Sequence, residues 1–190
     1  MDIFIRGKNI NLVVVDEEVV SNKSYYNWFN DEELTEHMQQ HYFPNTESLQ
    51  KYYYESFIQN NKNKLQLGIT DAATNILIGM ISLNSIDFLN QTCEIAGLIG
   101  EKKYQSMSYF TEANVLLIRH AFLNLNMNRV EAGMLSKSLQ LYHLRVLGFV
   151  DEGVRRKAVY KNGEFNNAYN LGILKEEFEN LDIYKVLGEN

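Results

Sequence analysis

The segment from Thr92 to Leu135 constrains the fold more than any other part of the chain. It is typical of a strand over 92–99, a helix over 109–125 and a second strand over 128–135. Parallel neighbours need a long crossover of this kind, because a tight hairpin can join only antiparallel strands. The segment therefore predicts two parallel strands that lie side by side in one sheet.

The remaining strands favour antiparallel pairing around that parallel pair. Strands expected over 65–70 and 76–83 are joined by a short polar turn, which is typical of a hairpin. Near the C-terminus, the pair Asn162-Gly163 predicts a second hairpin. The expected fold class is α/β (α+β): a mixed, mostly antiparallel sheet with a central parallel pair and helices on both faces.

Length and composition favour a single globular domain over residues 1–190. Hydrophobic residues make up 45% of the chain, and the net charge of −6 offers no basic face for nucleic acid. Cys93 is the only cysteine, so no internal disulfide can form. No apolar run approaches the ~18 residues that span a bilayer, and the first residues lack a secretory signal pattern. We expect a cytoplasmic protein with no membrane partner.

Several sequence motifs occur in the same order as in one enzyme family. The strand before the crossover helix reads Glu94-Ile95-Ala96-Gly97-Leu98-Ile99-Gly100-Glu101, and the helix contains Tyr109-Phe110-Thr111-Glu112-Ala113. Further along are Asn128-Arg129-Val130-Glu131-Ala132-Gly133 and Leu147-Gly148-Phe149-Val150. Together they resemble the GNAT superfamily of N-acetyltransferases, in the branch of ribosomal-protein N-terminal and amino-sugar acetyltransferases. The resemblance covers nearly the whole chain.

This resemblance implies that the two parallel strands splay around acetyl-coenzyme A, which serves as co-substrate. The pantetheine arm would pair with strand backbone, and backbone amides at the start of the crossover helix would hold the pyrophosphate. The candidate cofactor-binding residues are Leu98, Ile99, Gly100, Gln105, Ser106, Met107, Ser108, Tyr109, Phe110, Thr111 and Lys137.

The cofactor loop departs from the family pattern, in which Gln/Arg-x-x-Gly-x-Gly/Ala is usual. Gln105 fits this pattern, but Ser108 and Phe110 stand where small residues are expected. Glycine suits such a loop because a Cβ can block the approach of a phosphate. A serine hydroxyl can itself donate to phosphate. The Phe110 ring either points into the hydrophobic core or fills space that a phosphate would need.

Two side chains are candidates for moving protons. Glu94 lies on the strand that enters the loop and could take a proton from the acceptor ammonium, directly or through water. Equally, it could be a solvated strand carboxylate. The family often uses a tyrosine to reprotonate the departing thiolate. An ungapped count back from Gly148 puts Leu144 at that position, whereas a register with gaps gives the role to Tyr142.

The resemblance places the acceptor site near the first helices and the loop that follows them. The candidate substrate-binding residues are Trp28, His41, Tyr42 and Phe43. His37 and His41 are spaced to share a metal if they lie on a helix, but nothing nearby completes a ligand set, so we expect no metal.

The function expected from these motifs is direct transfer of an acetyl group from acetyl-coenzyme A to a primary amine. The acceptor would be the amino sugar of a nucleotide sugar or a protein N-terminus. One alternative is a GNAT-fold binding or regulatory protein that has lost normal coenzyme A binding. Another is an acyltransferase whose donor is a carrier-protein thioester. Because proteins of this family are often dimers, a homodimer is a further expectation.

Overall fold

A computed structural model describes residues 1–38 and 42–184 of the chain. The strands are β1 Ile3–Arg6, β2 Ile10–Val14, β3 Leu65–Asp71, β4 Leu77–Asp87, β5 Thr92–Ile99, β6 Arg129–Met134, β7 Val150–Lys161 and β8 Glu164–Leu174. The helices are α1 Glu17–Val20, α2 Lys23–Trp28, α3 Glu32–Thr35, α4 Glu47–Tyr53, α5 Met107–Leu123, α6 Lys137–Arg145 and α7 Lys175–Asn180. None of the helices in this described part is both long and apolar enough to cross a membrane.

The strands form one eight-stranded sheet in the order β1-β2-β3-β4-β5-β6-β8-β7. Strands β5 and β6 pair in parallel, whereas the other six neighbouring pairs of this sheet are antiparallel. The expected fold class is therefore confirmed, and so is the parallel pair that the crossover helix predicted. Asn162 and Gly163 form the β7–β8 turn with φ of 53° and 85°, which also confirms the second hairpin.

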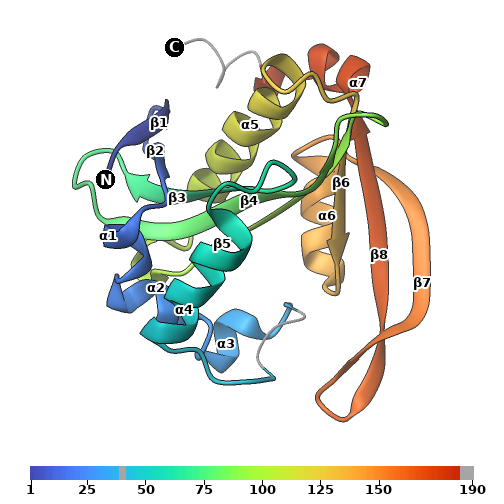
Figure 1. Ribbon diagram of the computed structural model, residues 1–190. Coiled ribbons are helices and arrows are strands. Elements are labelled where there is room, and N and C mark those ends of the chain that lie inside the picture. The colour runs from blue at the N-terminus through green and yellow to red at the C-terminus, as the bar shows by residue number, and fades with distance from the viewer. Residues whose placement is uncertain (39–41, 185–190) are drawn as a thin grey trace.

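Helices cover both faces of the sheet (Figure 1). Helix α5 packs on one face, where Cys93 and Ile95 of β5 join the main core. Helices α1 and α2 cover the other face, where Leu98 packs against a smaller cluster around Trp28. Successive side chains of a strand point to opposite faces. Strand β5 therefore presents its odd-numbered residues to α5 and its even-numbered residues to the first helices.

The parallel pair separates soon after it forms. Its register runs from Thr92 opposite Arg129 to Glu94 opposite Glu131 and ends there. Beyond this point β5 stays paired with β4, while β6 stays paired with β8 (Figure 1). An opening therefore separates the end of β5 from the end of β6, as expected for strands that splay around a ligand.

Helix α5 begins two residues earlier than the sequence pattern indicated, at Met107 rather than Tyr109. Ser106 precedes it with extended backbone dihedrals (φ −119°, ψ 151°), as is usual for an N-cap residue. The apolar periodicity on which the prediction rested starts only at Tyr109, because Met107 and Ser108 are exposed. The helix therefore starts before its buried face does.

Candidate functional site

The start of α5 carries unpaired hydrogen-bond donors. The first such bond of the helix runs from the backbone N–H of Phe110 to the Ser106 carbonyl, at 3.4 Å. Within the described residues, the N–H groups of Met107, Ser108 and Tyr109 have no acceptor. These groups and the positive end of a 17-residue helix dipole point the same way. The start of α5 is therefore suited to bind an anion.

Two serine hydroxyls lie beside these donors. The Ser106 and Ser108 oxygens are 3.0 Å apart, and both residues are exposed. Each hydroxyl can turn to donate to a bound anion. Gln105 is used differently, because its side-chain amide donates to the Ile99 carbonyl at 3.2 Å and so ties the loop to the end of β5.

The two aromatic side chains of the first turn, Tyr109 and Phe110, point away from the free amides. The Phe110 ring packs against Tyr142 and His143 of α6, with ring centroids 5.7 and 6.4 Å apart. It also contacts the main core, which is the first of the two alternatives left by the sequence. The Tyr109 hydroxyl donates to Asp71, the last residue of β3, at 3.2 Å. Although Ser108 and Phe110 replace the small residues of the family pattern, the backbone amides of the first turn therefore remain exposed.

Tyr142, a candidate proton donor, lies in the interior. Its hydroxyl is 2.8 Å from that of Thr111, and the two residues are 6% and 8% exposed. Burial raises the pKa of Tyr142 to about 12, although the bond to Thr111 acts in the opposite direction. Leu144, at the position given by the ungapped count, packs against the core, whereas Lys137 is exposed at the start of α6.

The backbone of β5 offers a free edge to the opening. The N–H of Gly100 donates to the carbonyl of Ile78 in β4, so even-numbered residues of β5 face β4. Odd-numbered residues face β6, as the bond from the Arg129 N–H to the Gln91 carbonyl shows. Because pairing with β6 ends at Glu94, the backbone of Gly97 and Ile99 faces the opening.

The position of Gly97 could have been found from the sequence, because hydrogen-bonding direction alternates along a strand. Of the three strand residues expected to pair with pantetheine, Ile99 faces the opening. The backbones of Leu98 and Gly100 are directed toward β4 instead.

Trp28, the last residue of α2, packs against the end of β5. It is 5% exposed, and its ring covers Gly100 so closely that a Cβ at that position would overlap it. The indole N–H donates to Glu101 at 3.3 Å. The Trp28 ring therefore leaves no room at position 100 for a residue with a side chain larger than hydrogen.

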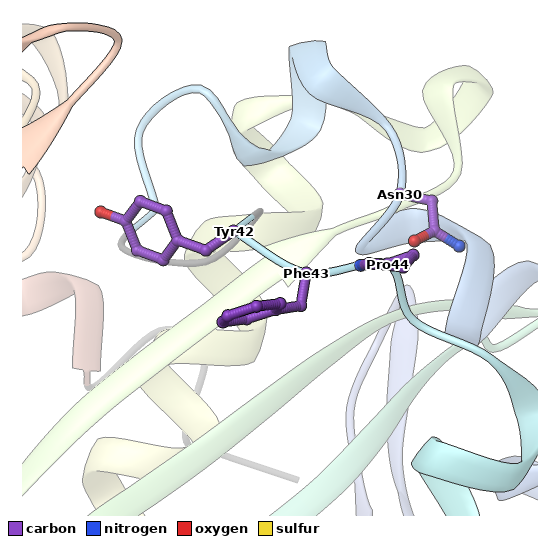
Figure 2. Close-up of a pocket in the computed structure, with 4 residues that line it drawn as sticks. All are labelled: Asn30, Tyr42, Phe43 and Pro44. Atoms are coloured by element: carbon purple, nitrogen blue, oxygen red, sulfur yellow. The ribbon is translucent and has the colours of Figure 1, made fainter.

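Tyr42 and Phe43 are exposed on the segment that follows α3. With Asn30 and Pro44 they line a pocket of about 360 Å³, in which the Tyr42 ring extends away from Asn30 and Pro44 (Figure 2). The Tyr42 hydroxyl donates to the Tyr160 carbonyl of β7 at 2.6 Å. His41 lies outside the described residues. A second pocket, lined by Arg156, Lys157 and Asn167, lies on the β7–β8 hairpin, so neither pocket coincides with the opening between β5 and β6.

Glu94 lies on the face opposite α5, at the last paired position before the opening. Its carboxylate is half-buried and reaches over Gly133 of β6, where no side chain intervenes. Burial raises the pKa of Glu94, and the negative charge of Glu131 adds to this effect. The Glu131 carboxylate accepts a bond from Arg129 at 2.8 Å, while the Glu94 carboxylate accepts no hydrogen bond in the described part of the chain. Such a carboxylate is available to accept a proton.

These features define a class of protein. An antiparallel sheet interrupted by one splayed parallel pair, with an anion-binding helix start beside the splay, is the architecture of GNAT acetyltransferases. The chain belongs to the acetyltransferase (GNAT) domain family, whose model matches residues 19–139.

Relatives of known sequence and structure agree with this assignment. A putative ribosomal N-acetyltransferase of Bacillus subtilis, YdaF, is 34% identical over 105 residues, covering 54% of this chain and 56% of its own. The probable N-acetyltransferase YjcK of the same organism is 33% identical over 113 residues, covering 59% and 62%. The chain thus spans somewhat less than two thirds of either relative's length.

Among solved structures, spermidine N-acetyltransferase from Vibrio cholerae in complex with CoA and spermine has a TM-score of 0.80. The match covers 90% of this chain and 99% of that one at 18% identity. At this identity the likeness demonstrates a shared fold.

Proposed function

We propose that the protein transfers an acetyl group from acetyl-coenzyme A, the donor used by its family, to a primary amine. The observation that carries this proposal is the start of α5, where three free backbone N–H groups adjoin two exposed serine hydroxyls. A diphosphate fits this arrangement because its oxygens accept several hydrogen bonds and its charge complements the helix dipole.

The chain's own groups suit the other parts of the cofactor. The backbone of Gly97 and the N–H of Ile99, on the edge of β5 that faces the opening, can hydrogen-bond to the amides of the pantetheine arm. Acetyl-coenzyme A, when bound, supplies the activated acyl group. This fit favours a coenzyme A donor over a carrier-protein thioester, which would not use the start of α5 in the same way.

Glu94 is the proposed general base. The amine nitrogen attacks the thioester carbonyl carbon, the carbon–sulfur bond breaks, and the proton lost by the amine passes to Glu94 directly or through water. A raised pKa makes this carboxylate a stronger base once it is ionised. Glu94 lies at the point where β5 and β6 separate. A donor bound between the two strands would place its thioester next to this carboxylate.

The charge around Glu94 favours a cationic acceptor. Glu131 lies directly across the parallel pair, and Arg129 beside it is itself shared between Glu131 and Glu152. A net negative site attracts a protonated amine and repels the phosphates of a nucleotide sugar. Of the two expected acceptors, we therefore propose a protein N-terminus.

Calorimetric titration with acetyl-coenzyme A tests the cofactor assignment. We expect micromolar affinity for the native protein, and a loss of about tenfold or more in Ser108→Asp, because the added carboxylate repels the diphosphate. Ser108→Ala is the neutral comparison and should lose only a few-fold. Absence of binding at millimolar ligand would instead support the binding-protein alternative.

Release of free coenzyme A thiol tests the reaction itself. With acetyl-coenzyme A present, a peptide with a free N-terminus should stimulate release, whereas a nucleotide-linked amino sugar should not. Glu94→Gln should lower kcat by about 100-fold, within the usual range for general-base catalysis, with little change in cofactor affinity. Full activity in Glu94→Gln would remove Glu94 from the mechanism.

A further inference from the structure

We infer that Tyr142 is a positioning residue that holds the start of α5 in its anion-binding geometry, and that it does not protonate the departing thiolate. This inference rests on the proposed function and assigns a specific role within it. It concerns a contact between two helices that are separated by a strand in the sequence.

Two consecutive residues at the start of α5 contact this one tyrosine. The Thr111 hydroxyl is hydrogen-bonded to the Tyr142 hydroxyl at 2.8 Å, and the Phe110 ring packs on the Tyr142 ring at 5.7 Å. Both contacts are made immediately after the three residues whose N–H groups are free. Any shift of Tyr142 therefore changes the direction of those donors.

The same turn is held on its other side by Tyr109, whose hydroxyl donates to Asp71. The free amides thus lie on a segment fixed toward β3 by Asp71 and toward α6 by Tyr142. A site whose donors are ordered before binding loses less conformational freedom when the ligand arrives. Weakening either attachment should therefore reduce cofactor affinity before it affects chemistry.

The surroundings of the Tyr142 hydroxyl argue against proton donation. Tyr142 is 6% exposed, and its hydroxyl is engaged with Thr111. The pKa of Tyr142 is raised to about 12. An ordinary cysteine thiol, for comparison, has a pKa of about 8.5, so proton transfer from this tyrosine to a thiolate would be unfavourable. We therefore expect the thiolate to take its proton from solvent.

Four variants test the assignment: Tyr142→Phe, Thr111→Val, their combination, and Thr111→Ser as the conservative change. Coenzyme A affinity is measured by calorimetry, and kcat and KM are measured across the pH range. We expect each hydroxyl deletion to weaken affinity about fivefold, which corresponds to one ordinary hydrogen bond. The double variant should be no weaker than either single one, since both remove the same bond.

We further expect Thr111→Ser to retain native affinity and kcat to change less than twofold throughout. The alkaline limb of the pH profile should not move in Tyr142→Phe. A large fall in kcat at unchanged affinity, seen in Tyr142→Phe but absent in Thr111→Val, would overturn the inference in favour of a proton donor. Unchanged affinity in all variants would overturn it as well.

The two proposals fail in different ways. If the native protein binds no coenzyme A, the proposed function is overturned together with this inference. If the native protein binds coenzyme A and the hydroxyl deletions leave affinity intact, only the inference is overturned. Thermal unfolding of each variant identifies a loss of affinity that arises from misfolding, and Thr111→Val remains informative if Tyr142→Phe does not fold.

Discussion

At the scale of single residues, Glu94 and Glu131 are paired across the parallel strands at the edge of the opening. Desolvation and then the second negative charge raise the pKa of Glu94. Because this pKa is higher in the folded than in the unfolded chain, the neutral carboxyl favours folding. That contribution is complete below the ordinary pKa and is lost as pH rises through the raised value.

The pair predicts how activity depends on pH. A base must be ionised, so the acid limb of kcat/KM should follow the raised pKa of Glu94. Glu131→Gln removes the charge that contributes to this shift and should move the limb to lower pH. Glu152→Gln, which removes a carboxylate bonded to Arg129, serves as the control. An acid limb that stays in place, or moves upward, would contradict the assignment of Glu94 as the base.

The contact between Gly100 and the Trp28 ring is a second feature at the scale of single residues. A methyl group at this position would overlap the buried Trp28 ring, so Gly100→Ala should destabilise the fold by ~1–3 kcal/mol, as overpacking commonly does. The free energy of unfolding in denaturant measures this cost. Trp28→Phe provides a smaller ring that leaves room for the added methyl group. The double variant should therefore lose less stability than the sum of the losses in the two single variants. Strict additivity would show that the ring is not the obstacle.

At the scale of elements, the β7–β8 hairpin is attached to the end of α3 and to residues that follow this helix. Lys161 is 8% exposed, and its ammonium donates to the carbonyls of Thr35 and Met38. One residue earlier, the Tyr160 carbonyl accepts a bond from Tyr42. The hairpin therefore contacts Met38 and Tyr42, and the second of these is an expected acceptor-site residue.

Lys161→Met removes these bonds while keeping an unbranched side chain. It leaves two carbonyls without their donor, so unfolding should become easier by ~1–3 kcal/mol. Denaturant unfolding measures the change, and amide hydrogen exchange over 35–38 should quicken. Arg155→Met, on an exposed part of β7, is the matched control and should stay within ~0.5 kcal/mol of the native protein. Equal effects of the two variants would mean that the buried ammonium contributes nothing.

At the scale of the whole molecule, a bound cofactor would connect α5 with the free edge of β5. Acetyl-coenzyme A at about 100 times its Kd should add ~2.7 kcal/mol of stability, or roughly 5–10 °C in Tm for a chain of this size. Acetylated pantetheine, which lacks the diphosphate, should produce little shift at the same concentration. Equal shifts from both compounds would show that the start of α5 does not bind the diphosphate.

The order of elements could be predicted because it depends on local signals. The crossover helix between 99 and 128 implied the parallel pair, and Asn162-Gly163 implied the last hairpin. The start of α5 was placed two residues late, because Met107 and Ser108 precede the periodic apolar residues. Strand alternation would have indicated Gly97, whereas the contact of Trp28 with Gly100 joins segments 72 residues apart and had no local signal.

The sequence by itself determined the fold class and the family, because turn residues, hydrophobic periodicity and motif order act over short stretches of chain. Only the tertiary structure decided which way Phe110 points and which partner the Tyr142 hydroxyl has. The same holds for the carbonyls that Lys161 contacts, 123 and 126 residues away. Each of these depends on the packing of distant segments, which becomes defined when the sheet and its helices assemble.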